Sequence, residues 1–128
     1  MDRVDFLEPV ATSGLISAAA THDIGVFAPP STTDHFRFTL PNKFFEYVMA
    51  GLALAVADLP EMSPLVNRFK LGRTIRESRP EAIASVINSF DPAEVDEFRG
   101  ASRQTARELN WESESPKLIE LVHRALEA

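Results

Sequence analysis

The sequence predicts an α/β fold, in which about four strands, most of them parallel, alternate with helices and precede a helical C-terminal region. Residues 52–57 form a continuous apolar run, which is typical of a parallel strand covered on both faces. Strand-like and helix-like segments alternate up to residue 76, and three helix-start patterns follow. We therefore expect one domain over residues 1–128, with a strand and helix part at 1–76 and a helical part at 78–128.

The first part is expected to hold four strands with helices between them. The strand candidates are Val4–Leu7, Ile24–Ala28, Leu52–Ala57 and roughly Arg73–Arg76. Helices are expected near Ser13–Thr21, from Asn42 to Gly51, and near Pro60–Asn67. The middle helix has the clearest ends, because the Asn42 side chain can cap its first turn and Gly51 permits the left-handed residue that stops it.

The second part is expected to be entirely helical. Ser78 to Glu81 has the pattern of a capping box with Pro80 in the first turn, and Asp91 to Glu94 repeats it. Ser115 and Pro116 are expected to open the last helix. Apolar residues recur at helical spacing after each start. Basic residues between the two parts, interpreted as solvated loop charges, are Arg68, Lys70, Arg73, Arg76 and Arg79.

Composition excludes some functions without selecting one. The 128 residues carry a formal charge of −6, which repels nucleic-acid phosphates and anionic lipid, so no nucleic-acid partner is expected. The chain has no cysteine, and His22, His35 and Asp23 do not have a metal-ligand spacing, so no metal is expected. The longest apolar run is about half the ~20 residues of a membrane-spanning helix, and no signal peptide is visible. These observations predict a cytoplasmic protein.

The segment from Leu40 to Gly51, followed by the apolar run and Asp58-Leu59-Pro60-Glu61, carries a family resemblance. It resembles the donor-binding signature of GT-B glycosyltransferases of the retaining, glycogen-synthase-like superfamily, especially polysaccharide-biosynthesis members with a Pro-Asn-Lys-x-x-Glu-Tyr stretch. The resemblance covers nearly the whole chain in the right order. It implies a partial Rossmann-like fold, the GT-B C-terminal half, and glycosyl transfer of the hexosyltransferase type from a nucleotide-diphosphate sugar in polysaccharide or glycoconjugate biosynthesis.

The resemblance also assigns donor-binding residues. Glu46 matches the family glutamate that accepts hydrogen bonds from the ribose hydroxyls of the nucleotide. Contacts with the donor phosphate or sugar are expected from Lys43, Asn42, Leu40 and Thr39. A different interpretation of Glu46 is a solvated residue that forms a weak helix-surface pair with Lys43. Capping alone also explains Asn42.

The family pattern has a second glutamate eight positions before Glu46, which contacts the donor sugar. Phe38 occupies that position in this chain. Asp34, His35 and Arg37 lie in the same loop and are alternative sugar contacts. We assign no catalytic residue. No cofactor is expected either, because the nucleotide-diphosphate sugar is the donor substrate.

The resemblance implies that only strands 3 to 6 of the second GT-B domain are present, and that the N-terminal acceptor domain is missing. We therefore expect this chain alone to be inactive, with peripheral membrane association left open for the full enzyme. The strand at Ile24–Ala28 would have an unpaired edge. Either Val4–Leu7 crosses over to pair with it, which we favour, or two copies associate edge to edge.

Two other functions are compatible with the sequence. The first is a non-catalytic α/β interaction module that associates through its open strand edge. The second is a fragment of a nicotinamide-dependent dehydrogenase, which has less support because the sequence contains no Gly-x-Gly-x-x-Gly.

Overall fold

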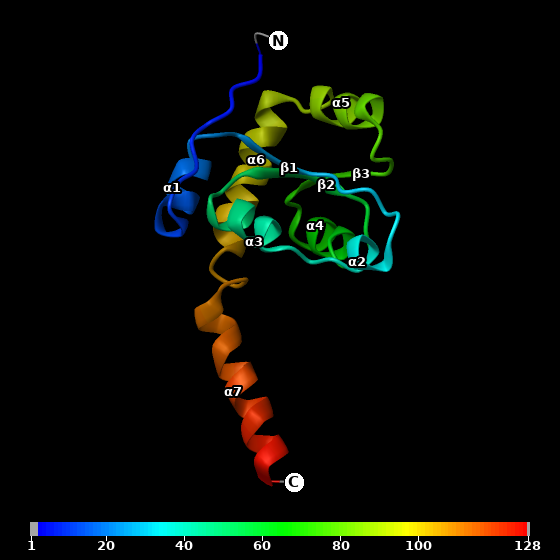
Figure 1. The fold of residues 1–128 in the computed structure, drawn as a ribbon. Helices are drawn as coiled ribbons and strands as arrows, with labels where there is room; N and C mark the ends of the chain where they lie inside the picture. The colour runs from blue at the N-terminus through cyan, green and yellow to red at the C-terminus, as the bar shows by residue number, and fades with distance from the viewer. Residues whose placement is uncertain (1–2, 128) are drawn as a thin grey trace.

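The structure is a computed structural model that describes residues 3–127 and shows an α/β fold with a three-stranded parallel sheet (Figure 1). The strands are β1 (Ile24–Phe27), β2 (Ala53–Ala57) and β3 (Gly72–Ile75), and they lie side by side in the order β1-β2-β3. Ile24 pairs with Ala53, and Leu54 pairs with Gly72. The carboxyl ends of all three strands therefore lie at the same end of the sheet.

Helices cover both faces of the sheet and one of its ends. They are η1 (Thr12–Gly14), α1 (Leu15–Ala19), α2 (Asp34–Arg37), α3 (Asn42–Met49), α4 (Ser63–Phe69), α5 (Pro80–Asn88), α6 (Pro92–Thr105) and α7 (Trp111–Glu127). In Figure 1, α3 and α4 lie on one face and α5 on the other. The connections from β1 through α3 to β2 and from β2 through α4 to β3 place both helices on the same face, as right-handed crossovers require.

The hydrophobic core lies between β2 and the helices α3 and α4. Every residue of β2 is buried, which confirms the interpretation of this apolar run as a strand covered on both faces. The buried members of the core cluster are Phe44, Val48, Leu54, Val56, Ala57, Leu59, Met62, Val66 and Leu71. Gly51 has a φ of +70°, so the left-handed stop of α3 is confirmed.

Helix α6 holds the amino-terminal end of the sheet. The buried Ser102 hydroxyl donates to the Leu52 carbonyl at 2.6 Å, and Arg99 forms an ion pair with Asp23 at 2.7 Å. Arg99 also donates to the Gly51 carbonyl. These contacts join α6 to the residues that immediately precede β1 and β2, and so fix where both strands start.

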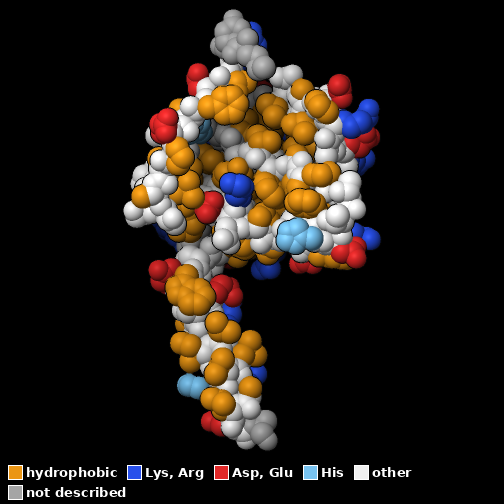
Figure 2. Space-filling view, viewed as in Figure 1, with side chains coloured by type: hydrophobic (Ala, Val, Ile, Leu, Met, Phe, Trp, Pro, Cys, Tyr) orange, Lys and Arg blue, Asp and Glu red, His pale blue; other side chains and the backbone are white. Residues whose placement is uncertain are grey.

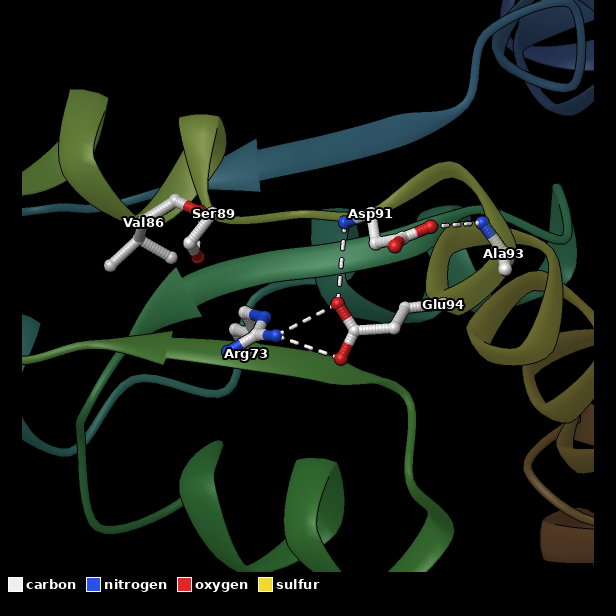
Figure 3. Close-up of polar contacts among 6 residues, drawn as sticks. All are labelled: Arg73, Val86, Ser89, Asp91, Ala93 and Glu94. Carbon is white, nitrogen blue, oxygen red and sulfur yellow. Dashed lines mark hydrogen bonds and ion pairs between the residues drawn. The ribbon is translucent and has the colours of Figure 1, made fainter.

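The first turn of α6 is joined to β3 through a charged pair (Figure 3). Arg73 Nη2 donates to both carboxylate oxygens of Glu94, at 2.8 and 2.9 Å. Asp91 accepts a hydrogen bond from the Ala93 N–H, while Glu94 accepts one from the Asp91 N–H, so the expected capping box is confirmed. The interpretation of Arg73 as a solvated loop charge is wrong, because it lies on a strand and is paired.

The expected strand at Val4–Leu7 is wrong. Residues 4–11 form no strand and are exposed, with Phe6 at 95% and Leu7 at 73%. A strand pattern needs a neighbouring strand to pair with, and this segment does not reach β1. The favoured crossover to Ile24–Ala28 is therefore also wrong, and the sheet has three strands among the described residues instead of about four.

Several expected helix starts also differ from the structure. Pro41 caps α3 without a side-chain hydrogen bond, so Asn42 is the first helical residue and not the cap. Ser78 does not cap α5, because its hydroxyl donates to the Pro29 carbonyl instead. The last helix begins at Trp111 and includes Pro116 in its second turn, four residues before the expected start. The helical character of the C-terminal region itself is confirmed.

Helix α7 extends away from the rest of the molecule (Figure 1). Figure 2 shows apolar side chains along this helix with no other part of the chain over them. None of the helices in the described residues combines the length and the apolar character that crossing a membrane requires.

Candidate functional site

A cavity of about 440 Å³ lies at the carboxyl ends of the three strands. Each strand is followed by residues that line it. They are Pro29 and Ser31 after β1, Asp58, Leu59 and Pro60 after β2, and Arg76 and Ser78 after β3, together with Ala57, Ile75 and Arg37. Ligands of open parallel α/β sheets bind in a crevice at this edge, and the volume is within the usual range for small-molecule sites.

Short hydrogen bonds hold the walls of this cavity together. The Ser78 hydroxyl donates to the Pro29 carbonyl at 2.9 Å and so joins the loops after β3 and β1. The Asp58 N–H donates to the Ile75 carbonyl at 2.8 Å, which extends the β2–β3 ladder by one residue. The Asp58 carboxylate accepts from the Ser63 hydroxyl at 2.5 Å. The cavity is therefore preformed by contacts within the chain.

The charges in the cavity favour an anion. Arg37 and Arg76 both line it, and Asp58 is the one carboxylate among the described residues that do so. Within residues 3–127, neither arginine forms an ion pair, although Arg37 lies over the Phe38 ring at 5.3 Å. Arginine presents planar, paired donors that match phosphate oxygens. The cavity can therefore receive a phosphate group without breaking an internal ion pair of either arginine.

Helix α3 carries most of the residues that the sequence assigned to donor binding. Helix α3 follows β1 and precedes β2 in the sequence. Because these strands are parallel, α3 runs back along the sheet, and its first residues lie near the carboxyl ends of the strands. Phe44 and Val48 are buried in the core, Glu46 is half-buried, and Lys43 is exposed. In the described residues, Lys43 and Glu46 form no side-chain hydrogen bond or ion pair with each other or with another group, so the surface pair of the alternative interpretation is absent.

The segment 39–46 and the carboxyl-end cavity are separate sets of residues. Thr39 is half-buried and Leu40 exposed, and neither they nor Lys43 and Glu46 line that cavity. Asn42 lines a second, mainly apolar groove of about 470 Å³ at the base of α7. The assignments of ribose to Glu46 and of phosphate or sugar to Lys43, Asn42, Leu40 and Thr39 therefore stay predictions.

Tyr47 fixes the position of α3 on β1. Its ring packs directly on Gly25, where a Cβ atom would lie 2.5 Å from the ring. Its hydroxyl donates to the Val26 carbonyl at 3.1 Å. Burial, and to a smaller extent the charge of Glu46, raises the pKa of the Tyr47 phenol. The contact sets the rotation of α3 about its axis, and with it the direction of the neighbouring Glu46.

Tyr47 also covers part of the open edge of the sheet. The Ala53 N–H donates to the Asp23 carbonyl, so alternation along β1 directs the polar backbone groups of Gly25 toward β2 and those of Ile24 and Val26 toward the open edge. The Tyr47 hydroxyl thus occupies the Val26 carbonyl. The edge of β1 is therefore not paired with Val4–Leu7, contrary to the favoured prediction, and one of its acceptors is taken by Tyr47.

The fold and the cavity together define an α/β domain with a preformed, arginine-lined cavity at the carboxyl ends of a parallel sheet. No protein family, no curated protein and no solved structure matches this chain. The residues from 3 to 127 contain no group of three or more His, Asp or Glu side chains placed to hold a metal ion.

Sequence reasoning missed that Arg37 and Arg76 line the same cavity. The sequence suggests Arg37 only as an alternative sugar contact and Arg76 only as a solvated loop charge. The signal that could have found Arg76 is its place at the end of an expected strand, since residues that follow parallel strands converge at one edge. Arg37 is 39 positions earlier in sequence, and only the fold brings α2 to the same cavity.

Proposed function

We propose that this domain binds the nucleotide-diphosphate sugar donor of a glycosyltransferase. The observation that carries the proposal is the cavity at the strand ends, where Arg37 and Arg76 have no ion-pair partner in the described chain. The likeness of residues 40–61 to the GT-B donor signature names the ligand class. An arginine-lined cavity alone would suit many phosphorylated ligands.

In this proposal the two arginines contact the diphosphate and Glu46 contacts the ribose. A diphosphate leaves with additional negative charge when the glycosidic bond to the donor breaks, and positioned guanidinium groups stabilise that charge. Glu46 would accept hydrogen bonds from the two ribose hydroxyls, which a carboxylate does with about 1.5–3 kcal/mol for each bond. The acceptor and the opposite wall of the cleft would come from another domain, so we expect no transfer by this chain alone.

Titration calorimetry with two ligands, uridine diphosphate and inorganic pyrophosphate, tests these roles separately. We expect weak binding of both, because one domain provides only part of the site. The double substitution Arg37→Ala and Arg76→Ala should weaken binding of both ligands at least tenfold. Glu46→Ala should weaken binding of uridine diphosphate but leave pyrophosphate unchanged, since pyrophosphate has no ribose.

Arg124→Ala is the matched control, because Arg124 is exposed on α7 and far along the chain from the cavity. It should leave both affinities unchanged. If the double arginine variant binds pyrophosphate as well as the original protein does, the cavity is not the phosphate site. If Glu46→Ala leaves the affinity for uridine diphosphate unchanged, the ribose assignment is wrong.

A further inference from the structure

Asp58 places a negative charge in a cavity that otherwise favours an anion. It lines the cavity together with Arg37 and Arg76, and within residues 3–127 it forms no ion pair with either arginine. A carboxylate that no cation neutralises repels a nearby phosphate group. A site for phosphate alone would therefore bind more tightly without Asp58. The carboxylate indicates that the ligand brings a second, different group to this wall of the cavity.

Contacts within the chain hold the Asp58 carboxylate in place. Its N–H donates to the Ile75 carbonyl at 2.8 Å, and one carboxylate oxygen, Oδ1, accepts from the Ser63 hydroxyl at 2.5 Å. The other oxygen, Oδ2, accepts no hydrogen bond from the described residues. A carboxylate has about four lone-pair sites, so Oδ2 is available to a ligand. Because the side chain is already ordered, it loses little conformational entropy when a ligand binds.

The ligand group that faces Asp58 has to donate hydrogen bonds. An ionised carboxylate only accepts them, and its hydrogen bonds are charge-assisted and stronger than those between neutral groups. A second anion would be repelled by Asp58, and an ammonium group would be repelled by the two arginines that line the same cavity. A neutral hydroxyl group satisfies both conditions.

Apolar side chains beside Asp58 fit the rest of a sugar ring. Leu59 and Pro60 follow it in the chain, and Pro29 and Ile75 also line the cavity. A sugar ring carries C–H groups as well as hydroxyls, so it can contact an apolar wall and a hydrogen-bond acceptor at the same time. Small-molecule sites commonly combine apolar lining residues with a few placed polar groups. The cavity thus has different lining residues for a phosphate and for a hydroxylated ring.

We propose that Asp58 determines the specificity for the donor sugar, by accepting a hydrogen bond from a sugar hydroxyl while Arg37 and Arg76 contact the diphosphate. This inference rests on the proposed donor-binding function. It restricts the donor to an uncharged hexose, because a uronic acid would bring a second carboxylate toward Asp58. Ser63 is a positioning residue, since it holds Asp58 but does not line the cavity.

Titration calorimetry with uridine diphosphate and uridine diphosphate glucose isolates the contribution of the sugar. The readout is the ratio of the two affinities. Asp58→Asn should lower this ratio by about threefold to tenfold, because a charge-assisted hydrogen bond becomes a neutral one. The same variant should bind uridine diphosphate as well as the original protein does or more tightly, since it no longer repels the diphosphate. Ser63→Ala should lower the ratio without tightening the binding of uridine diphosphate.

Uridine diphosphate glucuronic acid tests the restriction to uncharged sugars. Its additional negative charge alone would favour binding near two arginines. We nevertheless expect it to bind the original protein more weakly than uridine diphosphate glucose, and Asp58→Asn should narrow this difference. If the original protein binds the two sugar nucleotides equally tightly, Asp58 does not exclude a charged sugar.

Glu61→Gln is the matched control, because Glu61 is exposed three residues after Asp58 and does not line the cavity. It should leave every affinity unchanged. Inorganic pyrophosphate, which has no sugar, tests the donor site separately. If pyrophosphate binds through Arg37 and Arg76 but Asp58→Asn leaves the affinity ratio unchanged, the role of Asp58 is wrong and the donor site stands. If Asp58→Asn weakens all these ligands equally, Asp58 only supports the cavity wall. If pyrophosphate and uridine diphosphate both fail to bind, the donor site itself is wrong.

Discussion

Helices α3 and α7 are both amphipathic, but only one of them has its apolar face covered. Phe44 and Val48 of α3 are completely buried against the sheet, whereas the corresponding face of α7 is exposed along its whole length. Helical spacing shows which residues share a face. It does not show what lies opposite, because that depends on the path of the chain between elements. In this protein the short turn after Gly51 returns the chain to the sheet, while residues 107–110 direct α7 away from it.

The largest difference between the two helices is expected for loss of a core side chain. Phe44→Ala should lower the free energy of unfolding by about 3–5 kcal/mol, because it leaves a cavity in a packed core. Leu118→Ala on α7 should change it by less than about 0.5 kcal/mol in the monomer. Urea denaturation at low protein concentration measures both. Similar losses for the two variants would show that α7 folds together with the core.

A second comparison concerns two glycines, one beneath α3 and one in α6. Gly25→Ala should destabilise the protein by about 1–3 kcal/mol, because the new Cβ atom would overlap the Tyr47 ring and push α3 from β1. Gly100→Ala, where nothing lies within 4 Å, should instead stabilise the helix by about 0.5–1 kcal/mol. Thermal unfolding of the two variants distinguishes these signs. A neutral Gly25→Ala would mean that α3 can shift freely on the sheet.

The smallest expected effect is a pH dependence of the contact between β3 and α6. Hydrogen bonds from Arg73, and next from the Asp91 backbone, hold the pKa of Glu94 below its ordinary value of 4.5. A carboxyl group whose pKa is lower in the folded than in the unfolded protein stabilises the fold at pH values above its unfolded-state pKa. This stabilisation disappears as the pH falls through the folded-state pKa. Glu94→Gln should therefore reduce the loss of stability between neutral pH and pH values below about 4.5.

The control for this effect is Glu120→Gln, which removes a carboxylate that is paired with Arg124 on α7. It should leave the acid dependence of core unfolding unchanged. If both variants lose as much stability at acid pH as the original protein does, the pair between Arg73 and Glu94 contributes nothing measurable to folding.

The parts of the fold that were predictable from sequence are those decided by local chemistry. The buried run of β2 and the left-handed Gly51 depend on neighbouring residues, and so does the capping box at Asp91. The predicted strand at Val4–Leu7 is wrong because a strand requires a neighbouring strand, which a sequence pattern does not supply. The predicted helix cap at Ser78 is wrong because its hydroxyl donates to the Pro29 carbonyl, an acceptor far away in the sequence. Arg37 and Arg76 meet only through the fold.

The Tyr47 hydroxyl on the Val26 carbonyl has a consequence for the durability of the protein in solution. A four-residue edge strand with one of its two outward-facing acceptors occupied is a poor template for the stacking of further chains into fibrils. The raised pKa keeps the proton on Tyr47 under mildly alkaline conditions, so the phenol continues to donate there. Once strong alkali removes that proton, the carbonyl loses its donor, and precipitation that begins only at such pH would identify this edge as its origin.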